Sequence, residues 1–156
     1  MVRELVVGTV SVLTLSGSVF AQQGQLGTPN QAKAMLVRTV AAIKADPASA
    51  FAKIDKGEDG FREDDLYPYC FRTTDGKVVA SPLTRFMGMD IRAFKDPTGN
   101  TFGKDLYAAA QKTEGQITPV GPYMFPKPGT NAPLFPKVSF VERANNDIAC
   151  GVGYYK

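Results

Sequence analysis

The chain has 156 residues, of which 18 are Lys or Arg and 15 are Asp or Glu, so its formal net charge is +3 at pH 7. So small a charge, carried by basic residues that are mixed with acidic ones, does not favour binding to nucleic acid. The chain has no histidine, which excludes Ser-His-Asp and Cys-His catalysis, histidine-bound zinc or haem, and imidazole acid–base chemistry. We therefore expect a protein that is not an enzyme and needs no cofactor.

The first predicted element is an apolar run over residues 5–21, preceded by Arg3 and ending in Ala21. It predicts a secretory signal peptide over residues 1–21, cleaved after Ala21, and hence a periplasmic or secreted protein. The alternative is an uncleaved N-terminal membrane anchor, because the run approaches the length of a spanning helix. Glycine and serine within the run favour cleavage. Residues 22–28 are rich in Gln and Gly and predict a disordered lead-in to a single domain over residues 29–156.

A helix is predicted to begin at Thr28-Pro29, because the threonine hydroxyl can cap it and proline suits its first turn. Asp46-Pro47 is expected to restart the helix, which then ends at Gly57. Apolar residues recur between these points at helical spacing, namely Met35, Leu36, Val40, Ile43, Phe51 and Ile54.

The next segment predicts a β-hairpin. Residues 66–71 are aromatic and apolar, Asp75-Gly76 is a strong turn signal, and residues 78–80 return as a second strand. The acidic residues that precede the hairpin, between positions 58 and 65, lack the spacing of a calcium-binding loop. No metal site is expected there.

The second half of the chain predicts one more helix and three strands. Residues 83–94 are expected to be irregular or a short helix, and residues 102–112 a helix. A Pro-rich loop lies between the first two of the strands, which are predicted over residues 117–126, 137–143 and 147–155. Helices together with an antiparallel sheet of these strands make the expected fold class α+β.

Two cysteines, Cys70 and Cys150, lie in the predicted mature chain. In an oxidising compartment an even pair favours one disulfide. The alternative is a pair of buried free thiols.

Four segments resemble, in their order and spacing, the type-2 single Cache domain family: residues 66–82, Tyr123–Gly129 (YMFPKPG), Pro136–Val141 (PKVSFV) and Cys150–Tyr155 (CGVGYY). The resemblance covers residues 30–156. It implies a PAS-like antiparallel sheet of five strands, with a long N-terminal helix on one face and a small-molecule pocket on the other. It also implies an extracytoplasmic sensor domain, usually of a chemoreceptor or sensor kinase, whose usual ligands are small organic acids. Because the sequence ends at Lys156, we expect a free-standing form that reports through a separate partner.

The PAS-like strand order makes the first and last strands neighbours. If Cys70 pairs with Cys150, alternation places Tyr67, Tyr69 and Phe71 on the same face as Gly151 and Gly153, with aromatic walls over a floor without side chains. Glycine inside a strand often marks close approach of a ligand or another backbone, and the alternative is aromatic packing over a helix. The opposite face would carry Ile148 and Val152 against the long helix.

Polar side chains complete the candidate site. Lys137 could hold a carboxylate through a charge-assisted hydrogen bond, and Arg85 could add a bidentate contact. The candidate ligand-binding residues are Tyr67, Tyr69, Phe71, Arg85, Tyr123, Phe125, Lys137, Ser139, Gly151 and Gly153. The expected partners are a small carboxylate and a membrane receptor or sensor kinase. The alternative function is a protein–protein interaction module that docks on such a receptor or kinase.

Overall fold

The computed structural model describes residues 25–156, and the predicted signal peptide lies outside them. An antiparallel sheet of five strands, in the order β2-β1-β5-β4-β3, forms the centre of the domain. The α+β fold with a PAS-like sheet and an N-terminal helix is therefore confirmed. Its strands are β1 (Pro68–Arg72), β2 (Val78–Ala80), β3 (Thr118–Pro126), β4 (Leu134–Arg143) and β5 (Ile148–Tyr155).

The N-terminal helical segment begins and restarts where the sequence predicts. Helix α1 spans Pro29–Ala45, and a capping box between Thr28 and Gln31 fixes its first turn. Helix α2 spans Pro47–Lys56, and the Asp46 side chain accepts a hydrogen bond from the Ser49 amide at its start. Gly57 ends it with a φ of 68°, a left-handed conformation that glycine adopts without strain.

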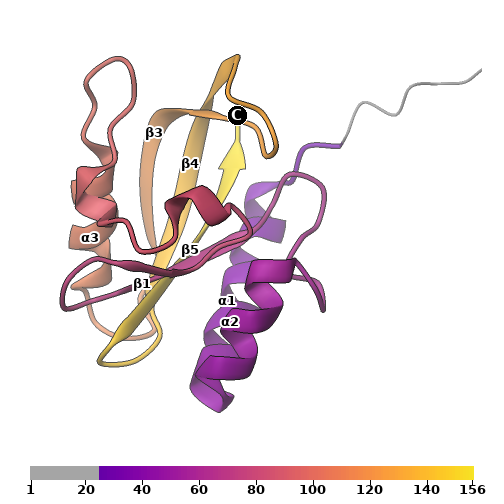
Figure 1. The fold of residues 1–156 in the computed structure, drawn as a ribbon, viewed down its shortest axis with the longest axis vertical. Helices are drawn as coiled ribbons and strands as arrows, with labels where there is room; N and C mark the ends of the chain where they lie inside the picture. Colours follow the sequence, from indigo (N-terminus) through magenta and orange to yellow (C-terminus); the bar gives the residue numbers. More distant parts are fainter. Residues whose placement is uncertain (1–24) are drawn as a thin grey trace, which may run out of the picture.

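The helices cover opposite faces of the sheet. Helices α1 and α2 lie on one side, and α3 (Phe102–Ala110) lies on the other, together with two short 3₁₀ turns, η1 (Thr84–Phe86) and η2 (Ile91–Ala93) (Figure 1). The face toward α1 buries Met35, Leu36, Val40, Ile43, Cys70, Ile148, Cys150 and Val152 in one apolar cluster. A second cluster lies on the α3 side and includes Phe71, Ile91, Phe102, Leu106 and Tyr123.

Strands β1 and β5 are adjacent, as the PAS-like order implies. Cys70 lies directly opposite Cys150 in the register, and the two are joined by a disulfide. The predicted assignment of faces also holds, because Ile148 and Val152 pack with α1 while Phe71 belongs to the cluster on the α3 side. The disulfide therefore links two neighbouring strands in the middle of the sheet.

Two strands begin two or more residues from the expected position, and α3 ends at Ala110 rather than at residue 112. Strand β4 begins at Leu134 rather than at residue 137, because residues 134–136 pair with the end of β3 and shorten the Pro-rich loop. Strand β1 begins at Pro68, so Tyr67 lies just ahead of the strand, where alternation does not fix its direction. Residues 25–28 form neither helix nor strand.

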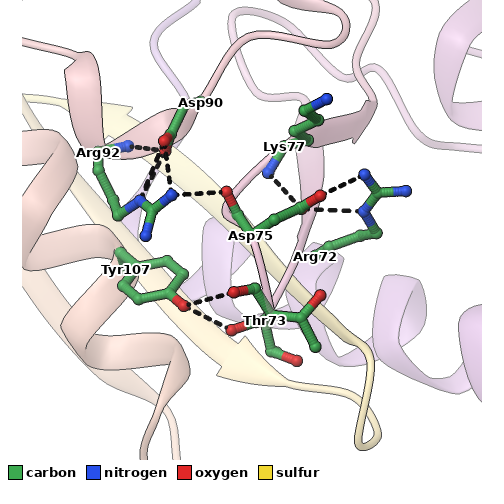
Figure 2. A network of polar contacts seen from close by, with 8 residues as sticks. Arg72, Thr73, Asp75, Lys77, Asp90, Arg92 and Tyr107 are labelled. Carbon is green, nitrogen blue, oxygen red and sulfur yellow. Dashed lines mark hydrogen bonds and ion pairs between the residues drawn. The ribbon is translucent and has the colours of Figure 1, made fainter.

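A polar network holds the turn between β1 and β2 against the α3 side of the domain (Figure 2). Asp75 pairs with Arg72 within the turn, and this guanidinium lowers the pKa of Asp75 to about 2. The Arg92 side chain donates to the Asp75 carbonyl over 2.9 Å, and the Tyr107 hydroxyl donates to the Thr73 carbonyl over 2.7 Å. These contacts fasten the turn to η2 and α3, which form one wall of the candidate site.

Candidate functional site

A small cavity lies on the α3 side of the sheet, between the sheet, α3 and the segment that carries η1 and η2. Its free volume is about 40 Å³. About 10–15 Å³ holds one water molecule, so the cavity has room for about three waters. Its walls are Tyr67, Tyr69, Val78, Ser81, Leu83, Phe86, Ile91, Phe94, Phe102, Leu106, Phe125 and Lys137.

Lys137 brings a basic group to this mostly apolar surface. It projects from β4, its exposed fraction is only 2%, and its Nζ donates to the Tyr67 hydroxyl over 3.0 Å and to the Tyr155 hydroxyl over 3.4 Å. Among residues 25–156 no carboxylate lies within ion-pair distance of Nζ. Burial lowers the pKa of Lys137 to about 7, against a smaller raising effect of the Asp65 charge. The buried amine therefore has no anionic partner among the described residues.

Aromatic rings surround the same amine. Nζ lies 4.4 Å from the ring centre of Tyr67, 4.7 Å from that of Tyr155 and 5.0 Å from that of Phe125. The faces of such rings attract a cation. They replace part of the hydration that Lys137 loses on burial, but they do not neutralise its charge.

Tyrosine hydroxyls supply further donors. The Tyr123 hydroxyl and the Ser139 hydroxyl are 2.6 Å apart and share a hydrogen bond. The Tyr69 hydroxyl is buried close to this pair, but no hydrogen bond of good geometry reaches it in the part of the chain that the structure describes. Burial raises the pKa of Tyr69 and of Tyr123 above the ordinary range, so both remain protonated donors at neutral pH.

The two glycines of β5 make room for these side chains. A Cβ atom on Gly151 would lie 2.5 Å from the Cζ and hydroxyl of Tyr69, and one on Gly153 would lie 2.3 Å from Cε of Lys137. The sequence pointed to a close approach over these glycines. In the structure the approaching groups are Tyr69 over Gly151 and Lys137 with Ser139 over Gly153.

The structure brings most of the predicted site residues together. Tyr67, Tyr69, Phe125 and Lys137 line the cavity. Among the others, Tyr123 and Ser139 lie beside them, Gly151 and Gly153 lie beneath them, and Phe71 is buried in the same apolar cluster without lining the cavity.

Arg85 lies outside the cavity. It is exposed, its guanidinium carbon lies 4.7 Å from the ring centre of Phe86, and its Nη1 donates to Asn131 over 2.9 Å. The reason is its place in η1, where the neighbouring Phe86 turns inward and Arg85 faces the loop between β3 and β4.

Sequence reasoning missed the wall formed by residues 81–94 and by α3. Phe86, Phe94 and Phe102 contribute its aromatic surface. Phe86 and Phe94 lie in a segment without a regular period that would assign a face. Phe102 begins the helix predicted over residues 102–112, but the sequence did not show which part of the sheet this helix covers. Tyr155 was also missed, although strand alternation places it on the same face as Gly151 and Gly153.

Comparison with known proteins agrees with this architecture. The family model described as Single Cache domain 2 matches residues 29–155. The chain therefore belongs to the single Cache domain family, whose members are sensor domains. No match is found among curated proteins.

Three solved structures share the fold. A methyl-accepting chemotaxis protein from Vibrio parahaemolyticus RIMD 2210633 aligns with a TM-score of 0.62 and 23% identity, over 81% of this chain and 86% of that chain. A periplasmic sensor domain of a chemotaxis protein aligns with a TM-score of 0.59 and 19% identity, over 81% and 88%. A structure described as the basis for carboxylic acid recognition by a Cache chemosensory domain gives 0.57 and 19%, over 81% and 86%.

Within the described range of 25–156, every helix is too short or too polar to cross a membrane.

Proposed function

We propose that this protein is an extracytoplasmic sensor domain that binds a small monocarboxylate at Lys137 and reports binding through a separate partner, without catalysing a reaction. The observation that carries the proposal is a buried amine beside a cavity, with no carboxylate paired to it among the described residues. Two hydroxyls accept hydrogen bonds from this amine, but a buried charge without an opposite charge beside it remains costly. A ligand carboxylate would supply the missing anion.

The donors suit one carboxylate group. Lys137 Nζ can contact one ligand oxygen, and the unpartnered Tyr69 hydroxyl can donate to the other. The remaining walls are apolar and would enclose a short aliphatic tail, with Phe86, Phe94 and Phe102 among them. A second carboxylate on the ligand would be buried there without a partner, so the cavity favours monocarboxylates over dicarboxylates.

The comparisons support this assignment at the level of the family. Single Cache domains are sensor domains, and one structural neighbour is described as recognising a carboxylic acid. The predicted signal peptide agrees with an extracytoplasmic site. We propose cleavage after Ala21, which the intact mass of the protein recovered from the producing cell would test.

Isothermal calorimetry with acetate and propionate tests the binding proposal, with succinate as the dicarboxylate comparison. We expect single-site binding of the two monocarboxylates, a large loss of affinity in Lys137→Met and a smaller loss in Tyr69→Phe. Lys33→Met is the matched control, because Lys33 is exposed on the α1 side and lies over Phe140. Equal binding by Lys137→Met and by the unchanged protein would refute the assignment.

One observation favours a second candidate function. The cavity is small because the protein's own side chains fill most of the space over the sheet, which suits an interaction module that docks on a membrane receptor or sensor kinase. If none of a panel of acids of up to four carbons raises the melting temperature, this second function is preferred. A ligand present at about 100 times its Kd should add about 2.7 kcal/mol to the free energy of unfolding, which is enough to be detected as a rise in the melting temperature.

A further inference from the structure

Three consecutive residues connect the cavity with the segment that precedes α1: Tyr67 lines the cavity, and Asp65 and Leu66 contact Gly27. The Tyr67 hydroxyl accepts the hydrogen bond from Lys137 Nζ over 3.0 Å. Two residues earlier, Asp65 Oδ1 accepts a hydrogen bond from the Gly27 amide over 2.8 Å. Gly27 directly precedes Thr28, the cap of α1. The cation of the site and the start of α1 are therefore held by the same short piece of chain.

The contact between Gly27 and this piece of chain is close. A Cβ atom on Gly27 would lie 2.2 Å from Cγ of Leu66, and Leu66 is itself completely buried. The backbone of Gly27 thus packs directly on the Leu66 side chain while its amide is bound by Asp65. Because two contacts fix it, a shift of residues 65–67 must shift or release Gly27.

Asp65 also has an electrostatic connection to the cavity. Its charge acts on both Lys137 and Tyr155, raising the pKa of each. Its second oxygen, Oδ2, is buried and has no hydrogen-bond partner within residues 25–156. The titratable and charged groups that act on the site are Asp65, Tyr67, Tyr69, Tyr123, Tyr155 and, from outside the cavity, Arg85. Among these groups, Asp65 alone carries a carboxylate.

We propose that Asp65 couples the occupancy of the Lys137 cavity to the segment that precedes α1, an inference that rests on the proposed function. Lys137 Nζ has three N–H donors, of which Tyr67 and Tyr155 accept two in the empty site. A ligand carboxylate takes the third and draws Nζ away from Tyr67. It also places a second negative charge near the incompletely bonded Asp65 carboxylate. Both effects loosen the hold of Asp65 on the Gly27 amide, so ligand binding frees the chain at the start of α1.

The hydrogen bond between Asp65 and the Gly27 amide lies where a structural change can be passed to a partner. The start of α1 and the end of β5 lie toward the same end of the domain (Figure 1), so the coupling acts where the chain enters the fold. Coupling between two sites is reciprocal. A partner that draws the segment before α1 away from Asp65 would therefore change the affinity of the cavity for the acid.

Amide hydrogen exchange followed by NMR tests the proposal on the unchanged protein. We expect the exchange rate of the Gly27 amide to rise severalfold at saturating acetate, while amides in the middle of β5 keep their rates. In Asp65→Asn the amide oxygen can still accept from Gly27 but carries no charge, so acetate should change the exchange rate much less. Asp64→Asn is the matched control, because Asp64 is an exposed neighbour and this variant should behave like the unchanged protein.

The pH profile of binding separates coupling from a structural role. Loss of the Asp65 charge removes the repulsion between this carboxylate and that of acetate, so Asp65→Asn should bind acetate more tightly than the unchanged protein at pH 6. It also removes a charge that keeps Lys137 protonated, so this advantage should shrink or reverse at pH 8. Unaltered exchange at Gly27 while acetate binds would overturn the coupling alone. Absence of acetate binding, seen as unshifted cavity resonances, would overturn the proposed function and the coupling with it.

Discussion

The affinity for acetate should fall as the pH rises through neutrality, because the binding group loses its proton there. In the empty site the pKa of Lys137 is about 7, and only the ammonium form can pair with a carboxylate. A bound carboxylate stabilises that charge, so the pKa of Lys137 in the complex must be higher than in the empty protein. Binding above the lower of these two pKa values is accompanied by uptake of a proton.

The size of the effect follows from the two protonation states. With a pKa of about 7, about nine tenths of the empty protein carries the ammonium at pH 6 and about one tenth at pH 8. The apparent Kd should therefore rise about tenfold between these values, which corresponds to about 1.4 kcal/mol. The chain has no histidine, so Lys137 is the side chain that we expect to change its charge in this interval.

Calorimetric titration with acetate in two buffers of different ionisation enthalpy measures both the apparent Kd and the number of protons taken up on binding. We expect uptake of about 0.1 proton per bound acetate at pH 6 and about 0.9 at pH 8. Lys33→Met should reproduce this profile, because Lys33 lies on the opposite side of the sheet. A Kd that stays constant between pH 6 and pH 8, with no proton uptake, would refute the role of Lys137 as the group that binds the carboxylate.

Three further predictions concern stability. The unfolded chain holds a proton on Lys137 up to its ordinary pKa of 10.5, while the empty folded protein releases it near 7. The free energy of unfolding should therefore rise by about 1.4 kcal/mol per pH unit between about pH 7 and 9, and urea titrations of Lys137→Met should lack this rise. Reduction of the Cys70–Cys150 disulfide, whose cysteines are 80 residues apart, should lower the free energy of unfolding by up to about 4–5 kcal/mol; an unchanged urea midpoint with reductant would contradict this. Gly151→Ala should destabilise the fold by about 1–3 kcal/mol, because its Cβ would overlap the Tyr69 ring, and undiminished acetate binding in this variant would show that the ring position is unimportant.

Local sequence signals determined the secondary structure well because each depends on neighbouring residues. Thr28-Pro29 and Asp46-Pro47 begin helices, and Asp75-Gly76 makes the hairpin turn, through short-range hydrogen bonds and backbone preferences. The start of β4 was placed too late because its first residues, Leu134, Phe135 and Pro136, pair with the end of β3. That pairing is a tertiary contact and outweighs the local preference of a Pro-rich segment for a loop.

The faces of the central strands followed from period-two alternation once the strand order was taken from the family resemblance. With Cys70 opposite Cys150, alternation alone assigned Tyr69 and the glycines of β5 to one face and Ile148 and Val152 to the other. Strand alternation also predicted that Lys137 lies near the aromatic side chains. Alternation could not predict on which face the Tyr67 side chain lies, because Tyr67 precedes β1. It could not place the irregular segment that closes the cavity either.

The sequence by itself thus determined the fold class, the helix and turn positions, the single cysteine pair and the absence of imidazole chemistry, because these depend on composition and short-range pattern. Only the tertiary structure decided which groups meet in the cavity. It left Arg85 outside, brought Phe86, Phe94 and Phe102 over the sheet, and buried Lys137 without an anionic partner in the described part of the chain. Burial lowers the pKa of Lys137 only because elements far apart in the sequence close over it and exclude water.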